Sequence, residues 1–133
     1  MAKLLIVEDD ESVRTLAARA LERAGHTVDV ACDGAQGLDC IRAAGGRFDL
    51  IVSDIRMPEM DGIEMAQAAA RAFPGLPILL MTGYADQRER AEELDAIILD
   101  VVQKPFTLAD IRDRVSLALV RSGQSTAALA GAA

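Results

Sequence analysis

The sequence predicts an α/β domain built on a parallel β-sheet. Short continuous apolar runs alternate along the chain with longer segments whose apolar residues recur at helical spacing. Elements that alternate in this way form β-α-β units, which place the strands parallel to one another. Because the apolar runs are continuous, we expect helices to cover both faces of the sheet. The expected strands are residues 4–7, 27–31, 49–53, 78–81 and a segment within 97–103, and the expected helices are residues 11–24, 35–44, 62–73, 86–94 and 107–120.

In the first half of the chain, glycines mark the ends of the expected helices. Gly25 follows the first helix, and Gly45 and Gly46 follow the second. Residues 27–31 are rich in β-branched side chains and residues 50–52 are wholly apolar, as is typical of strands. The apolar side of the first helix is expected to consist of Val13, Leu16, Ala17, Ala20, Leu21 and Ala24.

In the second half, Pro74 and Gly75 end the third helix before the next apolar run begins. Residues 86–94 are charged and have a weaker helical pattern, and the start of the fifth strand is not set by the pattern. The last helix begins with a capping box, in which Thr107 caps the helix and Asp110 follows three residues later. Its apolar side is expected to carry Leu108, Ile111, Val115 and Leu119.

Length and composition predict one folded domain. The chain has 133 residues, of which 51% are hydrophobic, enough to bury a core without disulfides or metals. We expect residues 1–121 to form the domain. Residues 122–133 are mostly Gly, Ser, Thr and Ala, so we expect a disordered tail there.

The charge of the chain limits the classes of partner. A net charge of −7 argues against binding to nucleic acid or to an anionic membrane, because both favour basic surfaces. The first apolar run is only four residues long, too short for a signal peptide or a membrane span. Cys32 and Cys40 are not spaced as metal ligands, and we expect a cytoplasmic protein with reduced thiols.

Polar residues follow four of the expected strands. In open α/β sheets, ligands bind outside the carboxyl ends of the strands, so these residues are expected to meet there. The second strand is followed by a turn and a helix start instead. The four sets are Glu8-Asp9-Asp10 after the first strand, Asp54 after the third, Thr82-Gly83 after the fourth and Lys104-Pro105 after the fifth.

This cluster of acids predicts a cation site. Several carboxylates cannot be ionised side by side without compensation, and Lys104 supplies only one positive charge. Two or three carboxylates with room for water suit Mg²⁺ better than Ca²⁺. Zn²⁺ is not expected, because no Cys/His cluster exists and the one histidine, His26, is expected in a solvated turn. Asp10 has two interpretations, as a further acid of the site or as the N-cap of the first helix.

Four stretches of the sequence resemble the receiver domain of two-component response regulators. They are Leu5 to Asp10, Ser53 to Gly62, Met81 to Gly83 and Lys104 to Phe106, and their order and intervals match that family from about Ala2 to Val120. The combination of the second and fourth stretches is the most specific signal. The resemblance implies a flavodoxin-like, doubly wound (βα)₅ fold with a five-stranded parallel sheet of order 2-1-3-4-5.

The resemblance also implies a role for each matched residue. Asp54 would accept the phosphoryl group, and Asp9 would bind Mg²⁺ directly. Glu8 would act through water or from behind the direct ligands, and the backbone carbonyl of Arg56 would complete the protein ligands. Thr82 and Lys104 would each contact a phosphoryl oxygen, and the bond between Lys104 and Pro105 would be cis.

The chain departs from the family pattern beside the expected switch. Many receivers carry an aromatic residue three positions before the lysine of the fifth strand, where this chain has Val101. Tyr84 lies two residues after Thr82, and we hypothesise that it reports the state of Thr82. A surface tyrosine that only shields the site is the alternative.

The resemblance implies a signalling switch rather than an enzyme with a substrate of its own. A histidine kinase or a histidine phosphotransfer protein would donate the phosphoryl group from phosphohistidine, and small acyl phosphates would substitute. At most the protein would phosphorylate and dephosphorylate itself. We expect a single-domain regulator that acts on an unknown protein target, with a weak likeness to adaptors of regulated proteolysis in alphaproteobacterial cell cycles.

Three other functions are open at this point. A pseudo-receiver would have lost an acid or Lys104, and all of them are present. An aspartyl phosphohydrolase or phosphomutase would want a second acid two residues after Asp54, where Arg56 stands. A flavin or nucleotide carrier would want a Ser/Thr/Gly-rich loop after the first strand in place of its acids.

Overall fold

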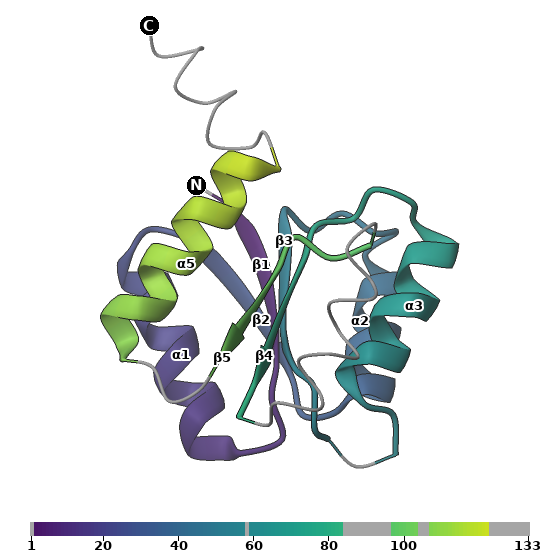
Figure 1. Ribbon diagram of the computed structural model, residues 1–133, viewed down its shortest axis with the longest axis horizontal. Helices are drawn as coiled ribbons and strands as arrows, with labels where there is room; N and C mark the ends of the chain where they lie inside the picture. The colour runs from purple at the N-terminus through teal and green to yellow at the C-terminus, as the bar shows by residue number, and fades with distance from the viewer. Residues whose placement is uncertain (1, 58, 84–96, 104–106, 123–133) are drawn as a thin grey trace, which may run out of the picture.

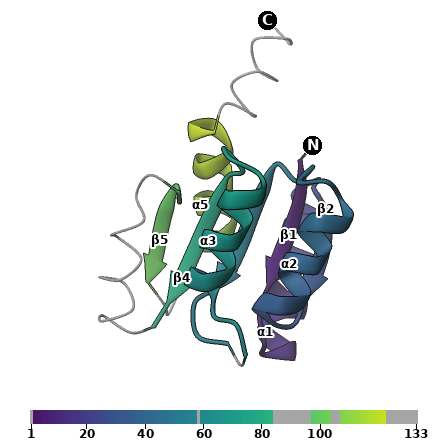
Figure 2. The same cartoon turned by 90° about the vertical axis from the view of Figure 1, so that its right-hand side faces the viewer.

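The computed structural model describes residues 2–57, 59–83, 97–103 and 107–122. Its five strands form one parallel sheet of order β2-β1-β3-β4-β5, which confirms the predicted order. Helices α1 and α5 cover one face of the sheet, and α2 and α3 cover the other (Figures 1 and 2). The elements are β1 (Lys3–Val7), α1 (Glu11–Arg23), β2 (Thr27–Ala31), α2 (Gly34–Ala43), β3 (Leu50–Asp54), α3 (Gly62–Ala72), β4 (Ile78–Thr82), β5 (Asp100–Gln103) and α5 (Leu108–Arg121).

The core is divided by the sheet into two halves, as expected from the continuous apolar runs. Successive side chains of a strand point to opposite faces, so each central strand supplies both halves. Leu5 and Val7 of β1 pack toward α2 and α3. Leu4 and Ile6 of the same strand pack toward α1 and α5. This burial on both faces holds the central strands in place, and with them the carboxyl edge of the sheet.

Two strands end one residue later than the sequence pattern predicts. The expected third and fourth strands end at residues 53 and 81, but β3 includes Asp54 and β4 includes Thr82. Asp54 lies opposite Met81, and Ile55 continues the ladder by donating its N–H to the Met81 carbonyl at 3.0 Å. The polar residues therefore belong to the sheet itself, because backbone pairing continues past the last apolar side chain.

Helix ends differ from the expected ranges by one residue. Ala24, Ala44 and Phe73 lie just outside α1, α2 and α3, as their C-caps. The capping box at the start of α5 is confirmed, since Asp110 donates its N–H to the Thr107 hydroxyl at 3.0 Å and Thr107 donates its N–H to the Asp110 carboxylate at 2.9 Å. The expected helix at residues 86–94 lies outside the described residues. So does the expected tail at residues 122–133, except for Ser122, which is the C-cap of α5.

Two leucines expected in the core are exposed instead. Leu16 of α1 is 51% exposed and Leu108 of α5 is 44% exposed. The helical spacing predicts an apolar stripe that is wider than the buried one. The buried positions of α1 are Ala17, Ala18, Ala20 and Leu21. Leu16 and Leu108 line a hollow of about 250 Å³ between the two helices, with Ala20, Arg19, Arg23 and Arg112.

No helix in the described part of the chain is long and apolar enough to cross a bilayer.

His26 is half-buried, so the expectation of a solvated turn residue is wrong. Its Nδ1 accepts a hydrogen bond from the backbone N–H of Ala2 at 3.2 Å, which ties the turn before β2 to the start of β1. Burial lowers the pKa of His26 below 6.5, and the nearby Asp49 carboxylate opposes this effect. Only the neutral imidazole can accept the Ala2 N–H, so the contact requires the unprotonated ring.

This contact predicts that stability depends on pH through His26. The unfolded chain binds the proton more readily than the folded one, so the free energy of unfolding falls as pH drops below about 6.5, the ordinary pKa of histidine. Urea denaturation at several values between about pH 7.5 and about pH 5.5 measures the slope. His26→Gln, which keeps an acceptor but does not titrate, should have a smaller slope, and an unchanged slope would contradict the assignment.

Candidate functional site

Three acids meet at the carboxyl edge of the sheet, as the sequence predicts. Oxygen atoms of Glu8, Asp9 and Asp54 all lie within 4.8 Å of one another. Glu8 is 1% exposed and Asp54 is 8% exposed, whereas Asp9 faces solvent. In the part of the chain that the structure describes, this is the one group of acidic, histidine or cysteine side chains close enough to share a metal ion.

The register of β1 against β3 brings these acids together. Val7 lies opposite Ser53, so the next residues, Glu8 and Asp54, come to the same edge. By strand alternation, Glu8 continues the side of β1 that carries Leu4 and Ile6, which is the side facing α1 and α5. Asp54 continues the corresponding side of β3, where Leu50 and Val52 lie. Both carboxylates therefore project from the same face of the sheet.

The backbone of Glu8 is held on both sides. Its N–H donates to the Ala31 carbonyl of β2 at 3.0 Å, and its carbonyl accepts a hydrogen bond from Nη1 of Arg14 at 2.9 Å. Arg14 belongs to α1, so this helix helps to fix the end of β1. The sequence gives no sign of this role for Arg14, because a helical arginine alone does not indicate that it reaches back to a strand end.

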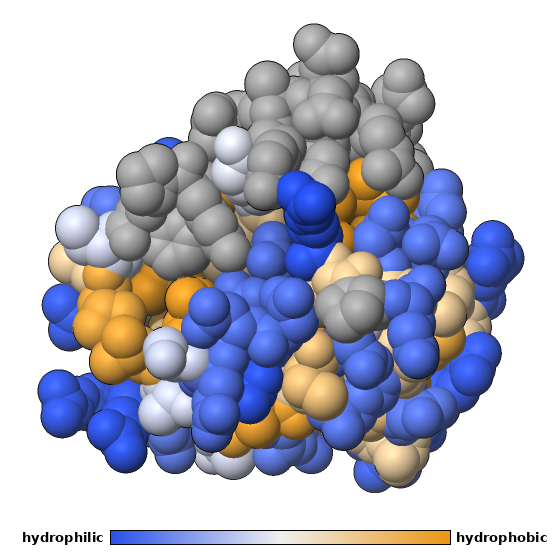
Figure 3. Space-filling model, turned by 90° about the horizontal axis from the view of Figure 1, so that it is seen from below, coloured by the Kyte–Doolittle hydropathy of each residue, from blue (hydrophilic) through white to orange (hydrophobic). Residues whose placement is uncertain are grey.

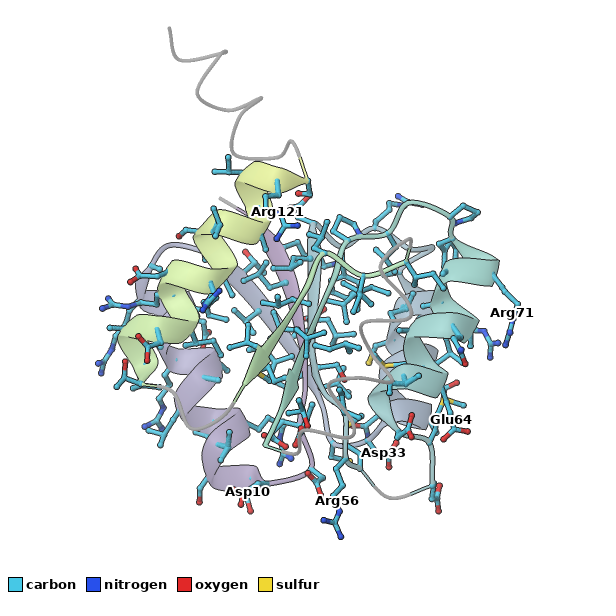
Figure 4. All side chains as sticks on the ribbon, in the orientation of Figure 1. Asp10, Asp33, Arg56, Glu64, Arg71 and Arg121 are labelled. Carbon is cyan, nitrogen blue, oxygen red and sulfur yellow. The ribbon has the colours of Figure 1, made fainter. Side chains whose placement is uncertain are left out.

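Asp10 is the N-cap of α1, which decides between its two interpretations. Its Oδ1 accepts the backbone N–H of Val13 at 3.0 Å, and its backbone dihedral angles are extended, as usual for a cap. Figure 4 shows Asp10 at the same end of the molecule as Arg56. The oxygen atoms that lie together in the acid group come from Glu8, Asp9 and Asp54, and Asp10 is not part of that group.

The loop after Asp54 folds back tightly to the start of α3. Gly62 donates its N–H to the Ile55 carbonyl at 2.8 Å. A methyl group on Gly62 would overlap the carbonyl oxygen of Asp54 and lie 3.0 Å from Cα of Ile55, so a side chain does not fit there. The hydroxyl of Ser53 donates to the same Asp54 carbonyl at 2.8 Å. These contacts fix the backbone on which Asp54 stands.

Arg56 lies within this loop with its side chain exposed. Figure 4 shows that side chain projecting away from the sheet into solvent. The resemblance assigns the metal-ligand role to its backbone carbonyl, and the position of Arg56 two residues after Asp54 is compatible with this role.

Glu59 has a strained backbone in the same loop. Its φ is +65°, in the left-handed region, where an L-residue with a side chain costs energy. Glycine, asparagine and aspartate are the residues usually found there, so the sequence offered no signal for this conformation. The tight closure of the loop on Gly62 maintains the strain.

Thr82 ends β4, the strand next to β3, and is buried, with 1% exposed. Val101 of β5 lies opposite Leu80 and is buried in the half of the core that faces α2 and α3. Thr82 continues the same side of β4 as Leu80 by strand alternation. Tyr84, Lys104 and Pro105 lie outside the described residues, so their expected roles stay predictions.

The chemistry of the cluster fits a hard divalent cation. Each of the three residues offers a carboxylate oxygen. Two of the residues, Glu8 and Asp54, are buried, and carboxylates repel one another more strongly when they are buried than when they are in water. Oxygen ligands with solvent access on one side suit Mg²⁺, which keeps several waters. The surface at this end of the molecule is largely hydrophilic where it is drawn in colour (Figure 3).

A family model described as the response regulator receiver domain matches residues 4–116. The chain belongs to this family. Response regulator MprA from Mycobacterium bovis (strain BCG / Pasteur 1173P2) is 36% identical to it over 126 residues, which are 95% of this chain and 54% of MprA. The chain therefore spans about half the length of the curated relatives it matches.

Solved receiver structures share the fold. A CheY-like receiver domain protein from Methanospirillum hungatei JF-1 has a TM-score of 0.83 at 27% identity, covering 94% of this chain and 98% of that protein. TrrA from Thermotoga maritima, solved in complex with Mg²⁺-BeF, has a TM-score of 0.78 at 26% identity, covering 89% and 99%. Receiver domains accept phosphoryl groups from histidine kinases or phosphotransfer proteins, and the acids around Asp54 are consistent with that function.

The cap at Asp10 generates a prediction about stability. Asp10→Ala should lower the free energy of unfolding by about 1 kcal/mol, because the Val13 N–H loses its acceptor. Asp10→Asn should remain close to the wild type, since asparagine caps equally well without the charge. Urea denaturation of both variants in the absence of divalent cations measures the difference. Equal stability of the two variants would contradict the capping role.

The strain at Glu59 generates a second prediction. Glu59→Gly and Glu59→Ala both remove the side chain, but only glycine adopts positive φ without steric cost. The glycine variant should be the more stable of the two by about 1 kcal/mol. Thermal unfolding followed by circular dichroism tests this difference. An alanine variant at least as stable as the glycine variant would show that the loop is not strained at this residue.

Proposed function

We propose that Asp54 is the phosphoacceptor of a signalling switch that takes its phosphoryl group from phosphohistidine in the presence of Mg²⁺. The observation that carries this proposal is the meeting of Glu8, Asp9 and Asp54 within 4.8 Å at the carboxyl edge of the sheet. An oxygen of the Asp54 carboxylate would bond to phosphorus while the bond from phosphorus to the donor histidine nitrogen breaks. An ionised carboxylate needs no general base for this step.

The cation proposed for the site is Mg²⁺. Asp9, Asp54 and the Arg56 carbonyl would hold it directly, and Glu8 would act through water or from behind these ligands. Bound there, Mg²⁺ supplies positive charge against the oxygens of the phosphoryl group. Support comes from the acid cluster and from TrrA, a structural neighbour solved with Mg²⁺-BeF.

The remaining roles concern the phosphoryl oxygens and the response to them. Thr82 and Lys104 would each contact one oxygen, and the bond between Lys104 and Pro105 would be cis. The burial of Thr82 beside Asp54's strand supports its part in this proposal. Tyr84 would report the state of Thr82. Val101 would stay in place, since a valine packed in the core has no aromatic ring to swing inward.

Signalling would proceed through protein contacts. Phosphorylation would shift an equilibrium between two surfaces of the domain, and a target protein would bind one of them. A histidine kinase or a histidine phosphotransfer protein would be the donor, with small acyl phosphates as substitutes, and the protein would also dephosphorylate itself. A cytoplasmic location is part of the proposal, and the free thiols of Cys32 and Cys40 support it.

Intact-mass analysis tests the phosphoacceptor directly. Incubation of the full chain with acetyl phosphate and Mg²⁺ should add one phosphate, and omission of Mg²⁺ should abolish the adduct. Asp54→Asn should also abolish it, whereas the matched change Asp39→Asn, at an exposed position of α2, should not.

A second measurement makes a negative result informative. Beryllofluoride with Mg²⁺ mimics the bound phosphoryl group, so it should shift the amide NMR signals of Asp54, Ile55 and Thr82. A chain that gains no phosphate and also shows no beryllofluoride shifts is a binding module that does not accept phosphate, and the proposal would then be wrong.

A further inference from the structure

Helix α2 begins directly against the loop that follows Asp54. Gly34 is the first residue of α2, and its α-carbon packs on the peptide of Met60. A methyl group on Gly34 would overlap the Met60 carbonyl oxygen and lie 2.9 Å from its carbonyl carbon. Contacts with backbone atoms cannot be relieved by rotating a side chain. An alanine at residue 34 would therefore move either the helix or the loop.

We propose that Gly34 is a positioning residue for the metal site, which sets the place of the Arg56 carbonyl through the β3–α3 loop. The inference rests on the proposed function, because it assumes that this carbonyl is a metal ligand. Gly34 contacts neither the cation nor the phosphoryl group. It acts by allowing Met60, four residues after Arg56 in the same loop, to lie against the start of α2.

Helix α2 is held in place more firmly than the β3–α3 loop. Leu38 and Ile41 are buried in the core, and the side chain of Asp33 caps the helix by accepting the Gln36 N–H at 2.8 Å. Gln36 returns a bond to the preceding loop, where its Oε1 accepts the Cys32 N–H at 2.7 Å. A larger residue at position 34 would therefore displace the loop more readily than the helix.

The loop has little freedom to absorb this displacement near Met60. Asp61 caps α3 by accepting the Glu64 N–H at 2.8 Å, and Gly62 is closed against Asp54 and Ile55. These contacts fix the residues that follow Met60. Between Ile55 and Met60, Met57 is also buried in the core, so the exposed Arg56 and the strained Glu59 are the residues most able to adjust.

Gly37 offers a matched control in the same helix. It is also buried, and a methyl group there would meet side-chain atoms, namely Sδ of Met65 and Cγ2 of Val7, each at 2.9 Å. Gly37→Ala therefore makes the same chemical change on α2 and crowds the core without touching the β3–α3 loop. Loss of stability alone would affect both variants, whereas loss of metal affinity is expected only for Gly34→Ala.

The experiment is a Mg²⁺ titration of ¹⁵N-labelled full-length protein followed by amide NMR. Gly34→Ala should weaken Mg²⁺ binding about tenfold, the lower end of the loss seen when a group that orients a ligand is changed. Gly37→Ala should bind Mg²⁺ like the wild type. Equal affinities in the wild type and in Gly34→Ala would overturn the inference while leaving the phosphoacceptor proposal in place.

The Mg²⁺ titration of the wild-type protein provides a second test, which does not depend on whether Gly34→Ala folds. If the start of α2 and the loop form one unit, the amides of Gly34 and Met60 should shift with the same midpoint as that of Asp54, and the Gly37 amide should shift less. Unshifted Gly34 and Met60 amides beside a shifting Asp54 amide would overturn the inference. No response anywhere in the wild type would instead contradict the proposed metal site itself.

Discussion

The site depends on the parallel pairing of β1 with β3. This pairing places Val7 opposite Ser53, so Glu8 and Asp54, which are 46 residues apart in the chain, come within 4.8 Å of one another at one edge of the sheet. Burying Glu8 and Asp54 together is unfavourable, because carboxylates repel and lose hydration. The apolar packing on both faces of the sheet offsets this cost. A cation that neutralises these carboxylates would lower that cost.

Around these carboxylates, two glycines allow backbone segments to lie against one another. Gly62 lies on the Asp54 carbonyl and Gly34 lies on the Met60 carbonyl, so the loop between them is closed at both contacts by residues without side chains. The positive φ of Glu59 is compatible with this closure, since a loop held at its ends has few conformations open to it. Small backbone displacements here would change the geometry of any ligand held by a loop carbonyl.

The residues of the site lie on different faces of the sheet. Glu8 and Asp54 project on the side of α1 and α5, whereas Thr82 continues the side of β4 that packs toward α2 and α3. Val101 is buried on that second side, opposite Leu80. A movement of Thr82 would therefore be felt first in the packing beneath α3, not in the hollow between α1 and α5 where Leu16 and Leu108 are exposed.

The sequence by itself determined the fold class, the strand order through the family resemblance, and the residues that gather at the carboxyl edge. Local patterns suffice for the fold class and for the strand-end residues, because apolar runs, caps and strand-end acids are features of neighbouring residues. Tertiary structure decided that Asp54 and Thr82 belong to their strands, that Leu16 and Leu108 are exposed, that His26 accepts a bond from Ala2, and that Gly34 bears on Met60. Each of these depends on which segments, far apart in the sequence, lie next to one another. Those contacts form only when the whole core packs.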